Sequence, residues 1–159
     1  MIAVMKYDYK KDLNTFIDNI ENKNIKNNSV IVGKINSNIQ SFLKQEGIKL
    51  HTRDVVLEVG SFFHILNKVK QDTQLPKELI RSFDETIQTP KRVFFDTVQK
   101  HINLIYVDSH DGRLYKVVVQ PNYYVKKDIY TNEIVSAGYI EERNLRDLNY
   151  IEIADPSSE

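Results

Sequence analysis

The sequence has no cysteine and no tryptophan, and only five glycines and four prolines occur among its 159 residues. Without cysteine there can be no disulfide framework, no thiolate metal site and no cysteine nucleophile. This composition fits a reducing compartment, so we predict a cytoplasmic location. No run of 18 apolar residues occurs, so we expect no membrane span. Residues 1–11 lack the apolar core and cleavage site of a signal peptide.

A net charge is also lacking, because 22 basic residues balance 22 acidic ones. The strongly basic surface of a non-specific nucleic-acid binder is therefore not expected. The charge is unevenly distributed, however. Residues 133–159 hold seven acidic side chains against Arg143 and Arg146, which leaves residues 1–132 with a surplus of five positive charges. Such a surplus is enough for a local phosphate site.

The first half of the chain has the periodicity of amphipathic helices. A length of 159 residues fits one domain, which can bury a core without disulfides or metals. Apolar spacing predicts helices at residues 11–20, from Ser37 to Gly47, at 61–70 and after Pro76. Ser37 and Gln40 have the spacing of a capping box, and Gly47 is well placed to end that helix.

After Pro90 the periodicity changes to that of strands. Strands are predicted at 93–96, 103–109, 114–120 and 133–140, with a tight turn at Asp111-Gly112. Residues 123–130 either extend a strand or form a loop, and two earlier segments, 29–35 and 54–58, are also predicted to be extended. The predicted fold class is α+β, with N-terminal amphipathic helices packed on a C-terminal antiparallel β-meander of about four strands.

Strand alternation sorts residues onto two faces of this meander. Packing the Val and Ile faces against the helices leaves Tyr106, Lys116 and Ser136 on the open face. A phenol, an ammonium group and a hydroxyl on one sheet face can hold a phosphate.

Residues 30–145 resemble the phage-associated branch of the barnase–EndoU–colicin–RelE nuclease superfamily. Residues 32–69 resemble its strand, short helix and histidine-bearing helix, in which the histidine is His64. NLIYVDSHDGRLYKVVVQ (103–120) resembles its central hairpin, and NEIVSAGYI (132–140) its last strand, where Ser136 takes the place of a common Thr or Ser. The resemblance implies a nuclease domain at 30–153, preceded by an N-terminal extension at 1–29. Residues 154–159 are expected to form a disordered tail, as the ends of domains often do. Two departures are Lys68, where relatives often carry a second histidine, and the long segment 121–132.

The resemblance implies a metal-independent ribonuclease without a cofactor, in which the ribose 2′-hydroxyl attacks the adjacent phosphorus. His64 would be the base or acid, because histidine titrates near neutrality. Lys116 would stabilise the phosphorane and Ser136 would hydrogen-bond a phosphate oxygen. Lys68, Tyr106 and Arg92 would bind substrate. Each of these residues also has a structural interpretation, as a solvated side chain or as packing within the sheet.

The other histidines are weaker candidates, and no pair of them has the spacing of a metal site. His51 lies in a charged loop, His101 precedes a strand and His110 belongs to the hairpin turn.

Three functions remain open at this point. The first is a toxin-like ribonuclease acting on RNA, with a protein inhibitor or a larger phage protein as partner. The second is a non-catalytic RNA- or protein-binding domain of a phage or mobile element, which the neutral charge and Lys68 favour. The third is an immunity or structural protein whose acidic C-terminal segment contacts a basic partner.

Overall fold

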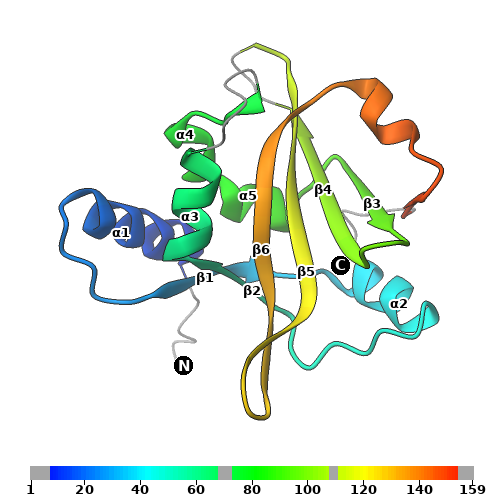
Figure 1. Ribbon diagram of the computed structural model, residues 1–159, viewed down its shortest axis with the longest axis horizontal. Coiled ribbons are helices and arrows are strands. Elements are labelled where there is room, and N and C mark those ends of the chain that lie inside the picture. Colours follow the sequence, from blue (N-terminus) through cyan, green and yellow to red (C-terminus); the bar gives the residue numbers. More distant parts are fainter. Residues whose placement is uncertain (1–7, 68–72, 108–110, 154–159) are drawn as a thin grey trace, which may run out of the picture.

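Figure 1 shows the computed structural model of the protein, which describes residues 8–67, 73–107 and 111–153. The helices are α1 (Tyr9–Glu21), α2 (Ser37–Gln45), α3 (Val59–Leu66), α4 (Lys77–Ile80), α5 (Phe83–Gln88) and the 3-10 helix η2 (Glu142–Arg146). The strands are β1 (Ser29–Lys34), β2 (Asp54–Glu58), β3 (Arg92–Asp96), β4 (His101–Val107), β5 (Leu114–Lys126), β6 (Ile129–Ile140) and β7 (Tyr150–Glu152).

All seven strands form one sheet in the order β1-β2-β6-β5-β4-β3-β7. The antiparallel meander of β3, β4, β5 and β6 is confirmed, because each strand pairs with the next along the chain. The sheet is larger than this predicted meander of about four strands, since three more strands belong to it. The early segments β1 and β2 pair with each other, and β2 joins β6 in parallel through two residue pairs, while β7 adds to the outer edge of β3. The fold therefore mixes helices with a larger, mostly antiparallel sheet, and η2 shows that the helical segments are not confined to the N-terminal half.

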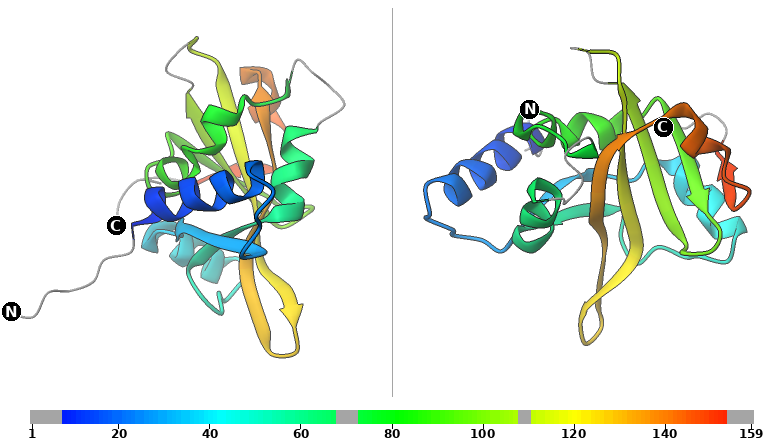
Figure 2. Two further views of the ribbon diagram at one scale, coloured as in Figure 1. Left: turned by 90° about the vertical axis from the view of Figure 1, so that its left-hand side faces the viewer. Right: turned by 45° about the horizontal axis from the view of Figure 1, so that its top comes forward.

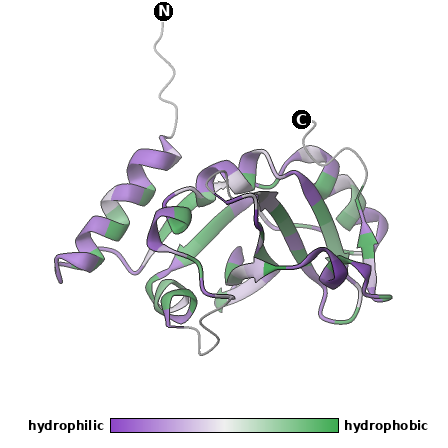
Figure 3. Cartoon of the chain, turned by 90° about the horizontal axis from the view of Figure 1, so that it is seen from above, coloured by the Kyte–Doolittle hydropathy of each residue, from purple (hydrophilic) through white to green (hydrophobic). Residues whose placement is uncertain are grey.

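The main core lies between the helices and one face of the sheet. Val117 and Val119 of β5 and Ala137 of β6 are fully buried there, together with Phe62 of α3 and Phe83 of α5. Burying such side chains is the dominant stabilising term of a domain, at about 1.5–3 kcal/mol each. Seen from above, hydrophobic residues concentrate along the strands in the middle of the molecule, whereas α1 mixes hydrophobic and hydrophilic residues (Figure 3).

The ends of α2 show how local sequence fixes a helix. Asn36, rather than Ser37, is the N-cap, because its side-chain oxygen accepts a hydrogen bond from the Ile39 N–H at 2.9 Å. At the other end Gly47 has φ +84°, and the Ile48 N–H donates to the Leu43 carbonyl at 2.8 Å. Gly47 thus ends this helix as predicted, since a residue without Cβ takes this conformation without strain.

The second face of the sheet is only partly covered. After β6 the chain turns through η2 and returns as β7, and this C-terminal segment packs over β3 and β4 (Figure 1). Phe94, Ile105 and Leu145 form a small second core beneath it. We call this side of the sheet the open face, because the strands next to this small core are left without a covering helix.

The alternation in β4 is opposite to the prediction. Leu104 lies in the main core and Tyr106 packs against it, whereas Ile105 belongs to the small core on the open face. Tyr106 pairs with Tyr115, whose ring centroid lies 5.7 Å away, and Tyr115 is fully buried on the helix-covered side. Placing Tyr106 on the open face beside Lys116 and Ser136 was therefore wrong. Ile105 is buried by the C-terminal segment, so apolar residues occur on both faces of this strand.

The hairpin of β5 and β6 is long, and its tip extends below the rest of the described chain in Figure 1 and in both views of Figure 2. Residues 123–130 extend the strands instead of forming a loop. In the part of the chain that the structure describes, no helix combines the length and the apolar character needed to cross a membrane. The predicted tail at 154–159 lies outside the described residues.

Candidate functional site

A row of polar side chains crosses the open face at the level where β3 turns into β4. Tyr150 pairs with Asp96, and Asp96 pairs with His101. On the neighbouring strands Gln120 pairs with Glu133. A side-chain hydrogen bond between Gln120 and His101, which raises the pKa of His101, connects this pair to β4. Directly opposed residues project on the same side of a sheet. The register therefore brings five polar residues from five strands into one line.

A cleft of about 250 Å³ lies over part of this row, where Asp96, His101 and Tyr150 line it. Its floor comes from the meander and its rim from the turn after β3 and from β7. The residues that line it are Asp96, Gln99, His101, Asn103, Lys116, Val118, Val135, Ser136 and Tyr150. An imidazole, an ammonium group, a carboxylate, two amides and two hydroxyls thus surround one small space.

Asp96 fixes the rim of the cleft. Its Oδ1 atom accepts hydrogen bonds from the backbone N–H groups of Val98 and Gln99, at 2.9 and 3.0 Å. This holds the short turn between β3 and β4, in which Lys100 adopts φ +61°. The same carboxylate raises the pKa values of His101, Lys116 and Tyr150, which places its charge among these three groups.

His101 is half-buried at the first position of β4. Burial lowers the pKa of His101 below its ordinary value, and the positive charge of Lys116 lowers it further. Asp96 and the Gln120 hydrogen bond act in the opposite direction and offset part of this lowering. An imidazole that is neutral at physiological pH and faces an ammonium group can accept a proton from a bound hydroxyl.

Burial lowers the pKa of Lys116 as well, and the charge of Asp96 offsets part of that effect. Lys116 stands on β5 between Ile105 of β4 and Gly138 of β6. Gly138 contributes no side chain beside Lys116, and Lys116 lines the cleft. Asn103, which is only 2% exposed, and Ser136 lie on the two sides of Val118 and offer hydrogen-bonding groups to the same space.

Two of the three residues predicted as catalytic, Lys116 and Ser136, line this cleft. The third, His64, is not among its lining residues. It has an exposed side chain on α3, the helix that contacts β2 and β6, and helical spacing turns it away from Phe62 and Ile65, which anchor that helix in the main core. The prediction that His64, Lys116 and Ser136 line one cleft is therefore wrong for His64. The histidine that lines the cleft with Lys116 and Ser136 is His101.

Arg92 forms a structural clamp. Its guanidinium donates two hydrogen bonds to the Glu152 carboxylate, at 2.9 and 3.0 Å, and a third to Glu142 at 2.9 Å. Its terminal carbon also lies 5.0 Å from the centroid of the Phe94 ring. Arg92 thus connects η2 and β7 to β3, and the carboxylates of Glu142 and Glu152 neutralise its positive charge. This arrangement argues against the substrate-binding role expected for Arg92.

Among the other predicted substrate-binding residues, Tyr106 lies on the helix-covered side, away from the cleft, and Lys68 lies outside the described residues. Within residues 8–67, 73–107 and 111–153, no three His, Asp or Glu side chains gather in a way that would hold a metal ion. A group such as a phosphate, which needs hydrogen-bond donors and a cation, matches the cleft better.

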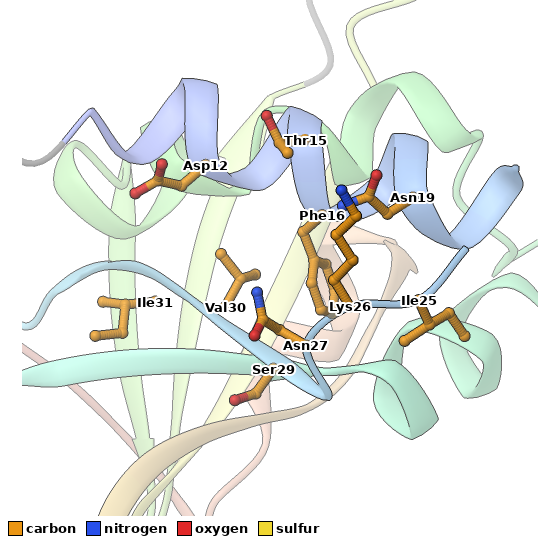
Figure 4. A pocket seen from close by; sticks show the side chains of 10 residues that line it. All are labelled: Asp12, Thr15, Phe16, Asn19, Ile25, Lys26, Asn27, Ser29, Val30 and Ile31. Atoms are coloured by element: carbon orange, nitrogen blue, oxygen red, sulfur yellow. The ribbon is translucent and has the colours of Figure 1, made fainter. Parts of the chain in front are cut away.

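A second hollow, of about 280 Å³, lies between α1 and β1. Figure 4 shows its side chains, which include Thr15, Phe16 and Asn19 of the helix and Val30 and Ile31 of the strand. Although it is slightly larger, the described residues that line it include no histidine, and Asp12 and Lys26 are the ionisable side chains among them. We therefore place the candidate chemistry in the cleft on the open face.

No family model, no curated protein and no solved structure matches the chain. The candidate site accordingly depends on the geometry of the cleft itself. Sequence reasoning missed His101, Asp96, Asn103 and Tyr150. A signal for His101 was available: it stands two residues before Asn103 and four before Ile105, so a single correct assignment of the β4 faces puts it on the open face.

Proposed function

We propose that the chain is a metal-independent ribonuclease-like domain that acts in the open-face cleft. The observation that carries this proposal is the gathering of His101, Lys116 and Ser136 in one space of about 250 Å³ on the meander. These groups can supply a base, a cation and a hydrogen-bond donor, which are what phosphodiester transesterification needs. The resemblance to the barnase–EndoU–colicin–RelE superfamily remains part of this proposal, with His101 in place of His64.

In the proposed reaction, neutral His101 removes the proton from the ribose 2′-hydroxyl. The 2′-oxygen then forms a bond to the adjacent phosphorus as the bond from phosphorus to the 5′-oxygen breaks. The Lys116 ammonium stabilises the phosphorane and donates a proton to the departing 5′-oxygen, while Ser136 and Asn103 hydrogen-bond the other phosphate oxygens. The products are a 2′,3′-cyclic phosphate and a free 5′-hydroxyl, and the two catalytic groups exchange their protons through solvent.

The test is incubation of the purified chain with total RNA in EDTA, followed by end-group analysis. We expect slow cleavage that leaves cyclic-phosphate ends and that survives the chelator. Lys116→Met and Ser136→Ala should each lower the rate by tenfold or more, whereas Lys44→Met, on the exposed side of α2, should leave it unchanged. No cyclic phosphate after long incubation would refute the catalytic proposal.

Asp96 favours a second candidate, a domain that binds RNA without cleaving it. A carboxylate inside the cleft offsets the charge of Lys116 and weakens its attraction for phosphate. A non-catalytic domain would bind RNA, lose affinity when Lys116 is replaced by Met, and yield no cyclic phosphate. The same assay therefore separates the two candidates.

A further inference from the structure

The outer part of the β5–β6 hairpin, residues 123–131, forms an arm that projects from the sheet (Figure 1 and Figure 2). We refer to it as the β5–β6 arm. Its strands stay paired to the end, with Tyr123 opposite Thr131, Tyr124 opposite Tyr130, and Lys126 opposite Ile129. Asp128 adopts φ +61° in the turn. The arm is thus a two-stranded ribbon whose register shifts once, between Tyr124 and Lys126.

Aromatic rings gather on this ribbon. Tyr124 and Tyr130 meet edge to face with their ring centroids 5.6 Å apart, and His51, from the loop before β2, stacks on Tyr130 at 4.4 Å. Tyr124 stands at the outer end of the three and is 57% exposed. A tyrosine that is anchored at one edge and open on the rest is a suitable surface for stacking a nucleic-acid base.

Positive charge surrounds these rings. Lys126 and Lys127 follow Tyr124 at the tip, and Lys49 belongs to the same loop as His51; all three are exposed. Asp128 is the one acidic residue of the arm, so the tip remains positive. Aromatic faces interleaved with ammonium groups are the pattern by which proteins hold single strands, through base stacking and phosphate neutralisation.

Two asparagines join the arm rigidly to the loop that carries His51 and Lys49. The Asn122 side chain donates to the Lys49 carbonyl at 2.8 Å and accepts from the His51 N–H at 3.1 Å. Asn132, which is fully buried, donates to the carbonyls of Thr52 and Asp54 at 2.8 and 2.9 Å. The surface is therefore preorganised, which reduces the entropy lost on binding.

We infer that the β5–β6 arm binds a single-stranded segment of RNA, with a base stacked on Tyr124 and phosphates near Lys126 and Lys127. This inference deepens the proposed function, because the same two strands carry Lys116 and Ser136. From Ser136 to Tyr130 the strand runs six residues, or about 20 Å. Alternation along β6 turns Tyr130 to the opposite face from Glu133 and the cleft, so an RNA strand that occupies both sites has to pass around the edge of the two-stranded arm. A flexible single strand can follow such a path, which makes single-stranded RNA the substrate class.

The test measures binding of a fluorescein-labelled 2′-O-methyl 12-nucleotide oligouridylate to the full chain. This probe has no free 2′-hydroxyl, so binding is measured whether or not the chain cleaves RNA. We expect Tyr124→Ala to weaken binding by roughly 5- to 100-fold, the usual effect of losing one stacking ring. Lys126→Gln with Lys127→Gln should also weaken it and should lower the slope of log affinity against log salt by about 1 to 2.

The matched control is Lys23→Gln with Lys44→Gln, which removes two exposed charges far from the arm and should leave the salt slope nearly unchanged. Arm variants that bind the 12-mer as tightly as the parent would overturn the inference, and a protein partner for the arm would then be the better interpretation.

The two proposals can fail separately. Binding that depends on the arm, without cleavage of unmodified RNA, would refute the catalytic proposal but support the arm as a binding site. Cleavage of RNA by a chain whose arm variants bind the 12-mer like the parent would support catalysis and refute the role of the arm.

Discussion

Asp96 and His101 are directly opposed residues of the antiparallel strands β3 and β4, at the point where the two strands separate into their connecting turn. Asp96 holds that turn through two backbone N–H groups and at the same time raises the pKa of His101 against the effect of burial. One carboxylate thus shapes the rim of the cleft and influences the protonation of its imidazole. This double role makes the pair the most informative place to test the proposed chemistry.

Asp96→Asn should shift the whole pH profile of RNA cleavage to lower pH. The acid limb follows His101, which must be neutral to act as a base, and the basic limb follows Lys116, which must be protonated. Asp96 raises the pKa of both groups, so its removal lowers both. Asn keeps an oxygen that can accept the two N–H groups of the turn, so the fold should persist.

The measurement is the rate at limiting RNA concentration from pH 4.5 to 10 for both forms. Both limbs should move in the same direction in the variant. Limbs that stay in place, or that move apart, would show that Asp96 does not act electrostatically on these two groups.

Glu133→Gln should stabilise the protein at alkaline pH and leave its stability nearly unchanged at pH 4.5. Glu133 is 1% exposed, and within the described part of the chain no well-aligned hydrogen bond reaches its carboxylate oxygens; an interaction with the Glu58 backbone lowers its pKa by less than burial raises it. Burial, followed by the charge of Glu58, raises its pKa from 4.5 to about 8. The unfolded chain therefore loses this proton near pH 4.5, whereas the folded chain keeps it until about pH 8, so stability falls as the pH rises between these values.

Urea unfolding at pH 4.5 and pH 8.5 measures this effect. One unit of pKa shift corresponds to about 1.4 kcal/mol. Between pH 4.5 and pH 8.5 the free energy of unfolding of the wild type should therefore fall by on the order of 2–4 kcal/mol relative to that of Glu133→Gln. Glu46→Gln, at an exposed position after α2, serves as the control and should show no such difference. An equal effect of Glu133→Gln at both pH values would contradict the protonated state of Glu133.

Gly33→Ala should destabilise the protein by about 1–3 kcal/mol, which is the usual effect of overpacking. A Cβ atom on Gly33 would lie 2.8 Å from Cγ2 of Ile87, a residue of α5 that is 1% exposed. Gly60→Ala is the matched control, because its Cβ would meet nothing within 4 Å and the residue lies in α3. It should be neutral or slightly stabilising.

Thermal unfolding of both variants checks this prediction. In the double variant Gly33→Ala with Ile87→Ala, the combined loss should be smaller than the sum of the two single losses, because removing the isoleucine branch relieves the clash. Strict additivity would show that the close approach of β1 and α5 does not limit residue 33.

The meander could be predicted from the sequence because its signals are local. Alternating apolar residues mark each strand, and the Asp-Gly pair marks the turn between two of them, where Gly112 has φ +71°. The parallel pairing of β2 with β6 could not be predicted from the sequence. It consists of two residue pairs, Val55 with Asn132 and Val56 with Glu133, and the members of each pair lie far apart in the sequence. The addition of β7 likewise depends on a distant clamp, which Arg92 forms with Glu152.

The site was predictable in part for a related reason. β5 has a consistently apolar side at Tyr115, Val117 and Val119, so Lys116 was placed on the correct face. β4 is buried on both faces, because the C-terminal segment covers Ile105, and its alternation therefore gave no unique answer. Because of that ambiguity, Tyr106 was assigned to the wrong face and His101 was not recognised as a residue of the open face. The resemblance to the nuclease superfamily then made His64 the leading histidine, although nothing in its own segment indicates which surface lies across from it.

The most direct test of this account compares two histidines in one assay. His101→Asn and His64→Asn are measured beside the wild type for the formation of 2′,3′-cyclic phosphate from RNA in EDTA. We predict that His101→Asn lowers the rate by about 100- to 10,000-fold, as expected for a lost general base, and that His64→Asn stays within about twofold of the wild type. Loss of activity in His64→Asn, with His101→Asn unaffected, would contradict the assignment of catalysis to the open-face cleft.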